Sequence, residues 1–126
     1  MRMIIGGVAQ GKLNFAMRKY NITENDIFDI EICAFEEIEN KRCINNYDRV
    51  IKALMERKEN PLAFTENLIK RNSDMIIIMN EIGNGIIPIE KEERLWREQT
   101  GKIGCRLAEL SESVERIICG IAVVLK

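Results

Sequence analysis

A short apolar segment that runs directly into a glycine-rich turn constrains the fold of this chain more than any other feature. Residues 4–13 read Ile-Ile-Gly-Gly-Val-Ala-Gln-Gly-Lys-Leu, so the pattern Gly-x-x-x-x-Gly-Lys extends from Gly6 to Lys12. This spacing wraps backbone N–H groups around a phosphate, and the lysine adds a positive charge. A helix is expected over 12–20, directly after the turn. The order strand, loop, helix therefore predicts a phosphate-binding site.

The loop residues expected to hold nucleotide phosphates are Gly6, Gly7, Val8, Ala9, Gln10, Gly11, Lys12 and Leu13. Leu13 stands where such loops normally carry a Ser or Thr, whose hydroxyl binds Mg²⁺. A leucine side chain cannot bind a metal, so the metal ligands remain unknown at this stage. The alternative interpretation is a glycine turn with a purely structural role.

Composition narrows the functional classes. A chain of 126 residues fits one domain spanning 1–126. Its 19 basic and 20 acidic residues create no overall positive field, which argues against nucleic-acid binding. The longest apolar runs, 75–79 and 120–125, are too short for a membrane span.

Cysteine and histidine usage adds two further expectations. The four cysteines form no Cys-x-x-Cys pair and no apolar signal segment precedes the first strand, which favours a cytoplasmic protein with reduced thiols. The sequence contains no histidine. Chemistry on this chain therefore depends on carboxylates, Lys, Arg and backbone dipoles.

Hydrophobic periodicity predicts alternating strands and helices. Strands are expected at 1–5, 27–32, 74–81, 114–119 and 121–125, helices at 12–20, 45–57, 61–71 and 89–110, and one acidic helical turn at 34–41. The run 74–81 is continuously apolar before it turns polar, which is typical of a central parallel strand covered on both faces. We expect its carboxyl end to lie beside the glycine-rich loop, because ligands of open α/β sheets bind there.

Two groups of polar residues are further site candidates. Glu81 follows the buried strand and could orient Mg²⁺ or accept a proton from a substrate hydroxyl; the alternative is a turn in which its carboxylate binds backbone amides. Arg94 and Arg97 share a helix face with the small residues Gly101, Gly104 and Ala108. They could hold phosphate or carboxylate oxygens, or form surface ion pairs.

Four segments together resemble the adenosylcobinamide kinase/adenosylcobinamide-phosphate guanylyltransferase family. They are Gly-Gly-x-x-x-Gly-Lys at 6–12, Asn-Glu-Ile-Gly-x-Gly-Ile-Ile-Pro at 80–88, Arg-x-x-Arg-Glu-x-x-Gly-Lys at 94–102 and Val-Glu-Arg-Ile-Ile-Cys-Gly-Ile at 114–121. The ordered resemblance covers 74–126 and is supported at 4–12. Residues 21–73 match poorly and are fewer than in the usual family equivalent.

The resemblance implies an α/β fold like that of P-loop NTPases, a three-layer sandwich with a mostly parallel central sheet. It also implies a small homo-oligomer, commonly a trimer, that acts in cobalamin biosynthesis. Family members phosphorylate a hydroxyl of adenosylcobinamide with ATP or GTP and then transfer GMP through a histidine. Because this chain has no histidine, the guanylyl-transfer half is expected to be absent.

By the same resemblance, Lys12 and the loop amides would hold the nucleotide phosphates and Glu81 would lie near the transferred group. Arg94 and Arg97 are the helix residues to test next. Two departures stand out: Leu13 replaces the Ser or Thr, and Gly104-Cys105 replace a common Asn-Gln. Three hypotheses follow: a kinase acting on a cobinamide-type hydroxyl, a kinase for an unrelated small molecule, and a non-catalytic ligand-binding or assembly module.

Overall fold

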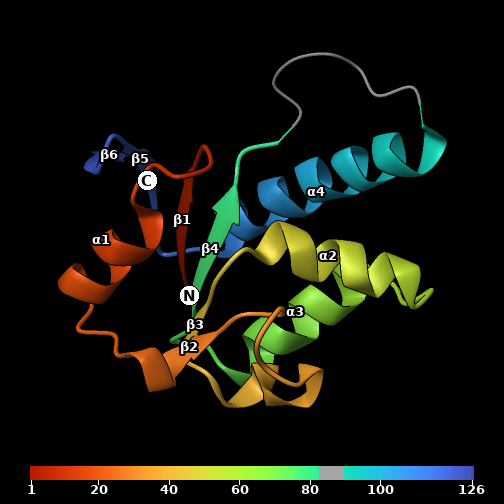
Figure 1. Cartoon of the computed structure of the whole chain (residues 1–126), viewed down its shortest axis with the longest axis horizontal. Helices are drawn as coiled ribbons and strands as arrows, with labels where there is room; N and C mark the ends of the chain where they lie inside the picture. Colours follow the sequence, from red (N-terminus) through yellow and green to blue (C-terminus); the bar gives the residue numbers. More distant parts are fainter. Residues whose placement is uncertain (83–89) are drawn as a thin grey trace.

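The computed structural model describes residues 1–82 and 90–126 (Figure 1). The strands of this part of the chain form one sheet in the order β2-β3-β4-β1-β5-β6. Five of them are parallel, and β6 runs antiparallel to β5. The strands are β1 (Arg2–Gly6), β2 (Ile27–Phe28), β3 (Cys43–Ile44), β4 (Ile76–Asn80), β5 (Ser113–Ile118) and β6 (Ile121–Val124).

Helices cover both faces of the sheet, as Figure 1 shows. The α-helices are α1 (Lys12–Lys19), α2 (Tyr47–Glu56), α3 (Pro61–Arg71) and α4 (Lys91–Leu110); short 3₁₀ helices occupy Glu24–Asp26 and Phe35–Asn40. Helix α1 packs on one face, whereas α2, α3 and α4 pack on the other. The resulting three-layer α/β fold with a mostly parallel sheet confirms the predicted fold class. No helix of the described residues is long and apolar enough to cross a membrane.

Strand β4 shows how the sequence produces these layers. Its side chains alternate between two hydrophobic clusters, because successive side chains of a strand point to opposite faces. Ile76 and Ile78 join the cluster under α1, whereas Ile77 and Met79 join the cluster under the other three helices. A strand buried on both faces must be apolar throughout, which is the pattern that the sequence shows.

The predicted helix 61–71 is confirmed together with its start signal. The Asn60 side chain accepts hydrogen bonds from the backbone N–H groups of Leu62 and Ala63, at 3.1 and 3.2 Å. Pro61 occupies the first helical position, where its missing N–H costs nothing. Local chemistry alone therefore fixes the beginning of α3.

The region between α1 and α2 differs from the prediction. The strand expected over 27–32 is only two residues long, since Asp29 turns the chain by accepting a hydrogen bond from the Glu31 N–H at 3.0 Å. Strand β3 was not predicted at all. A two-residue strand carries no recognisable alternation, and its pairing with β2 and β4 defines it.

Most predicted boundaries also shift by one or two residues, and the following elements show why. Helix α2 begins at residue 47 rather than 45, because Asn46 adopts a left-handed conformation (φ 51°) immediately before it. Helix α4 begins at residue 91, and its predicted start at 89 lies outside the described residues. Strand β5 ends at 118, since Cys119 belongs to the following turn.

The helices that follow β1 and β4 in the chain lie on opposite faces of the sheet. These strands are neighbours, and Gly6 of β1 is in register with Asn80 of β4. The chain continues from β1 into α1 on one face, and α4, which follows β4 in the chain, lies on the other. Such a divergence opens a crevice at the carboxyl edge of a parallel sheet. The predicted phosphate loop begins at this crevice, and Glu81 lies beside it.

Candidate functional site at the carboxyl edge of the sheet

The β1–α1 loop, residues 6–12, depends on glycine at two positions for different reasons. A Cβ atom at Gly6 would lie 2.6 Å from the Ile117 carbonyl oxygen, so only glycine allows the two backbones to approach this closely. Gly11 has φ +90°, a conformation that side chains disfavour, and it precedes the first residue of α1. Ala9 also has positive φ, at 57°. The loop therefore folds back on itself before it enters the helix.

The turn between β5 and β6 supports this loop from behind. Gln10 accepts two hydrogen bonds from the turn: its carbonyl from the Gly120 N–H at 2.8 Å, and its side chain from the Cys119 N–H at 2.7 Å. Cys119 and Gly120 have φ values of 49° and 77°, as in a tight two-residue hairpin turn of type I′. The loop conformation is thus tied to a segment far away in the sequence.

Lys12 lies at the start of α1 and is only 6% exposed. Its Nζ donates a hydrogen bond of 2.5 Å to the Gly7 carbonyl oxygen. Burial lowers the pKa of Lys12, and the negative charges of Asp48 and Glu81 oppose this shift. The site therefore holds a desolvated ammonium group beside backbone N–H groups of a helix start, which is an arrangement that favours anions.

Asp48 is a site residue that the sequence analysis missed. It lies in the first turn of α2, is 3% exposed, and accepts hydrogen bonds of 3.2 Å from both the backbone N–H and the side-chain amide of Asn80. The Asn80 amide also donates to Asn46 at 3.0 Å. In the sequence, Asp48 closely follows the polar pair Asn45-Asn46, which was the available signal. Because strand β3 was not predicted, the sequence did not reveal that this segment begins at the carboxyl edge of the sheet.

Glu81 forms a two-point ion pair with Arg116. The Arg116 Nε and Nη2 donate to the two carboxylate oxygens at 2.7 and 3.0 Å. Among the described residues, the Glu81 carboxylate therefore has a side-chain partner from β5, whereas the turn at 83–89 that the alternative interpretation concerns lies outside the described residues. Its own backbone N–H donates to Gly6 at 2.9 Å, which fixes Glu81 next to the β1–α1 loop. The partner Arg116 has a raised pKa because of this hydrogen bond.

A pocket of about 340 Å³ opens between the β1–α1 loop and the start of α2. This volume lies at the lower end of the range for small-molecule sites. All but two of the predicted phosphate-binding residues line it, and it also receives side chains from Asn45, Asn46, Arg49 and Asn80. Arg94 and Arg97 lie on the first half of α4 and do not line this pocket.

The described residues contain no group of three or more His, Cys, Asp or Glu side chains placed to hold a metal ion. Asp48 and Glu81 are the two carboxylates close enough to Lys12 to raise its pKa against the effect of burial. Leu13 follows Lys12 and contributes an apolar side chain to the pocket wall. The carboxyl edge of the sheet therefore brings the Lys12 ammonium, which lines the pocket, close to two carboxylates that do not line it.

Comparison with known proteins places this arrangement in a family. A sequence model described as cobinamide kinase / cobinamide phosphate guanyltransferase matches residues 41–125. The chain belongs to this family. The match extends the resemblance into 41–73, which the sequence analysis considered poorly matched, and the β1–α1 loop precedes the matched residues. Asp48, Asn80, Glu81 and Arg116 all lie within the region that the cobinamide kinase / guanyltransferase family shares.

One curated relative is similar over a shorter stretch. The bifunctional adenosylcobalamin biosynthesis protein CobU of Salmonella typhimurium (strain LT2) is 33% identical over 52 residues. These residues are 41% of this chain and 29% of the relative. The aligned stretch thus spans less than a third of that protein, and it supports membership of the cobinamide kinase / guanyltransferase family.

Proposed function

We propose that the pocket beside the β1–α1 loop binds the phosphates of ATP or GTP. The buried Lys12 ammonium carries this proposal, because a lysine desolvated at a helix start is costly unless an anion compensates it. The predicted contacts are the backbone N–H groups of residues 6–13 and the Lys12 Nζ. Family membership supports a nucleotide substrate.

We further propose that the protein transfers a phosphoryl group to the hydroxyl of a cobinamide-type alcohol. The hydroxyl oxygen would form a bond to the γ-phosphorus while the bond to the leaving diphosphate breaks. Glu81 would accept the hydroxyl proton, after Arg116 has oriented its carboxylate. Lys12 would stabilise the charge that develops on the phosphate oxygens. Guanylyl transfer through a histidine is not part of this proposal, because the chain has no histidine.

Calorimetric titration tests nucleotide binding directly. Wild-type protein should bind ATP or GTP, and Lys12→Ala should abolish binding because it removes the buried positive charge. Lys70→Ala, which changes an exposed lysine on α3, is the matched control and should bind as the wild type does. Titration with and without Mg²⁺ determines whether the metal is needed although Leu13 replaces the usual ligand. Unchanged binding by Lys12→Ala would contradict the proposal.

A kinase assay tests the role of Glu81. Glu81→Gln should lower turnover by roughly 10²–10⁴-fold, the range typical of general acid–base catalysis, while nucleotide binding is retained. Equal turnover by the variant and the wild type would remove Glu81 from the reaction.

The second candidate function is a non-catalytic ligand-binding or oligomeric assembly module, and two observations favour it. Leu13 removes the usual metal ligand, and the outer strand β6 exposes several apolar side chains. The exposed residues of this hairpin, which we call the β5–β6 apolar surface, are Ile118, Ile121, Val123, Val124 and Leu125. A homo-oligomer, with a trimer as the expectation from the family resemblance, would cover them.

Restoring the hydroxyl separates the two functions. Leu13→Ser should increase Mg²⁺-dependent turnover if the chain is an enzyme that lacks one metal ligand. An assembly module should gain no turnover from the same change, while its oligomeric state stays as in the wild type.

A further inference from the structure

The pocket beside the β1–α1 loop has a wall that carries only positive charge. None of the described residues that line it is acidic, although the chain contains 20 acidic residues. Its two charged lining residues are Lys12, on the loop side, and Arg49, on the α2 side. The nearby carboxylates of Asp48 and Glu81 already have hydrogen-bond partners. A concave site with two cations on its wall attracts an anion of several negative charges, such as a triphosphate.

Arg49 has hydrogen-bonding capacity to spare. It lies in the first turn of α2, and its side chain is 54% exposed. Its Nη1 donates a hydrogen bond to Glu31 Oε1, and the described part of the chain gives the guanidinium group no second partner. Because a guanidinium group carries five N–H donors, most of them remain available to a ligand.

The ion pair between Arg49 and Glu31 can be exchanged at little cost. Glu31 is exposed, and it lines a neighbouring pocket that also includes Arg49, but not the pocket beside the β1–α1 loop. Ion pairs between exposed side chains contribute little to stability. A phosphate group offers the planar guanidinium a two-point contact and more negative charge than one carboxylate. Rotation of the Arg49 side chain would therefore replace a weak partner by a stronger one.

Asn80 indicates which phosphate group Arg49 would meet. Asn80 lines the pocket and directly precedes Glu81, the proposed proton acceptor. Its side-chain amide donates to Asn46 Oδ1 at 3.0 Å, and the backbone N–H of Arg49 donates to the Asn46 carbonyl at 2.9 Å. Asn80 is thus next to Glu81 and next to the turn that carries Arg49. Since the transferred phosphate must face Glu81, the terminal phosphate is the one on the Arg49 side.

We propose that Arg49 binds the terminal phosphate of the nucleoside triphosphate, and that it exchanges its ion pair with Glu31 for this contact. The inference rests on the proposed nucleotide site and adds a residue to it from α2. Arg49 then distinguishes ATP from ADP, because ADP has no phosphate at the Glu81 end of the pocket. Glu31 competes with the nucleotide for Arg49, and the ion pair forms again once the terminal phosphate has been transferred.

A second exposed ion pair of the same kind provides matched controls. Arg71 Nη1 pairs with Glu39 Oε1, and neither residue lines the pocket beside the β1–α1 loop. Arg49→Ala and Glu31→Gln remove the charges of the proposed contact, whereas Arg71→Ala and Glu39→Gln remove equivalent charges elsewhere. Both arginines are exposed helix residues, and alanine is the residue most favourable to a helix, so we expect all variants to fold. Circular dichroism checks this.

Calorimetric titrations with ATP and with ADP test the contact. Arg49→Ala should weaken ATP binding roughly 10- to 100-fold, the range for hydrogen bonds between charged groups, and ADP binding less than about threefold. Arg49→Lys should lie between the wild type and Arg49→Ala, because it keeps the charge but loses the planar group. Glu31→Gln should strengthen ATP binding by about two- to fivefold, since it removes an exposed competitor. Both control variants should bind as the wild type does.

The outcomes separate this contact from the nucleotide site itself. Equal ATP binding by Arg49→Ala and Arg71→Ala would overturn the contact, and equal losses for ATP and ADP would overturn its assignment to the terminal phosphate. Weaker ATP binding by Glu31→Gln would overturn the exchange. Loss of both nucleotides by Lys12→Ala beside wild-type affinity of Arg49→Ala would reject the role of Arg49 alone. Failure of the wild type to bind either nucleotide would reject the nucleotide site and Arg49 with it.

Discussion

Gly6 and Gly7 are neighbours in sequence, but the structure gives them different roles. A Cβ at position 6 would lie 2.6 Å from a backbone oxygen of Ile117, whereas one at position 7 would lie 3.6 Å from the flexible Gln10 side chain. Gly6→Ala should therefore lower the free energy of unfolding by about 1–3 kcal/mol, the usual cost of overpacking.

Gly7→Ala serves as the control and should change stability by less than ~1 kcal/mol. Urea denaturation measures both variants. Similar losses of stability in the two variants would contradict the steric role of the close contact between Gly6 and Ile117.

Lys12 should make the free energy of unfolding depend on pH in the alkaline range. Its pKa lies below the ordinary value of 10.5 in the folded protein, so protonation favours the unfolded chain. The penalty is fully present below the lowered pKa and disappears as the pH rises above 10.5. Lys12→Met, which keeps the chain length and removes the charge, should thus be more stable than the wild type at neutral pH.

The stability difference between Lys12→Met and wild type should shrink as the pH approaches 10.5, because the wild-type lysine then becomes neutral in both states. Chemical denaturation across the alkaline range measures this difference. A difference that stays constant with pH would contradict the role of desolvation.

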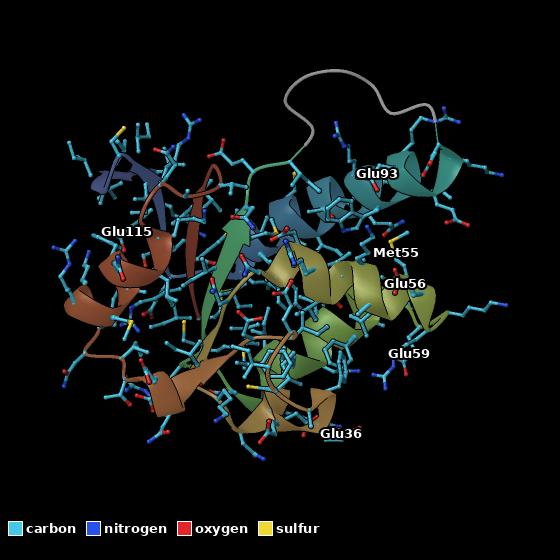
Figure 2. All side chains as sticks on the ribbon, in the orientation of Figure 1. Glu36, Met55, Glu56, Glu59, Glu93 and Glu115 are labelled. Atoms are coloured by element: carbon cyan, nitrogen blue, oxygen red, sulfur yellow. The ribbon has the colours of Figure 1, made fainter. Side chains whose placement is uncertain are left out.

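The candidate site could be predicted only in part at the scale of single residues. The pattern from Gly6 to Lys12 and the carboxylate of Glu81 are visible because each follows an apolar strand directly. Asp48 and Arg116 were not predicted, since they reach the site through the packing of α2 on β4 and the pairing of β5 with β1. Figure 2 shows a comparable case in Glu115, which lies beneath α1 although it belongs to β5.

Glu115 shows how such a contact stabilises an element. Glu115 is 2% exposed, and its carboxylate accepts hydrogen bonds from the Tyr20 hydroxyl and from Lys19 Nζ, the latter at 2.7 Å. Tyr20→Phe should cost about 1–2 kcal/mol, because it leaves a buried carboxylate with one partner fewer. Thermal unfolding measures the loss, and Phe15→Leu on the same helix, which keeps an apolar side chain, provides a comparison without this bond.

The β5–β6 hairpin makes a prediction at the scale of elements. Both central residues of its turn have positive φ, for which the preferred pair is Asn-Gly. Cys119→Asn should therefore stabilise the protein by a few tenths of a kcal/mol, whereas Gly120→Ala should destabilise it by ~1 kcal/mol. A Cβ at 120 would meet nothing within 4 Å, so any loss reflects backbone conformation alone. Opposite signs in calorimetric unfolding would confirm the turn type.

Element prediction succeeded where local signals were strong. The long helices and β4 each show a clear hydrophobic pattern over many residues, and α3 also has an N-cap residue, Asn60. The two-residue strands β2 and β3 have no period to recognise, and only sheet pairing defines them. Asn46, a turn residue with positive φ, sets the start of α2, and hydrophobic periodicity does not detect a boundary at this precision.

At the scale of the whole molecule, β6 is the outermost strand on its side of the described sheet. Ile121 and Val124 are each 69% exposed, and the strand carries no charged residue, although exposed edges usually carry charges that prevent association. If the β5–β6 apolar surface joins copies of the chain, Ile121→Lys should lower the molar mass in solution.

Light scattering coupled to size-exclusion chromatography measures the mass of Ile121→Lys. Ile32→Lys is the control, because Ile32 is also exposed, at 84%, but lies outside the hairpin. An unchanged mass for Ile121→Lys beside an oligomeric wild type would place the interface elsewhere.

The support of the β1–α1 loop by the β5–β6 turn has a consequence for the order of assembly. Gln10 and Cys119 are 109 residues apart along the chain. During synthesis the loop emerges early, but the turn behind it emerges only after β2, β3, β4 and the long helices. In a nascent chain that ends before the β5–β6 turn, the glycine-rich segment lacks the two hydrogen bonds that Gln10 accepts from this turn. Acquisition of nucleotide affinity would thus report that the last strands have reached their places.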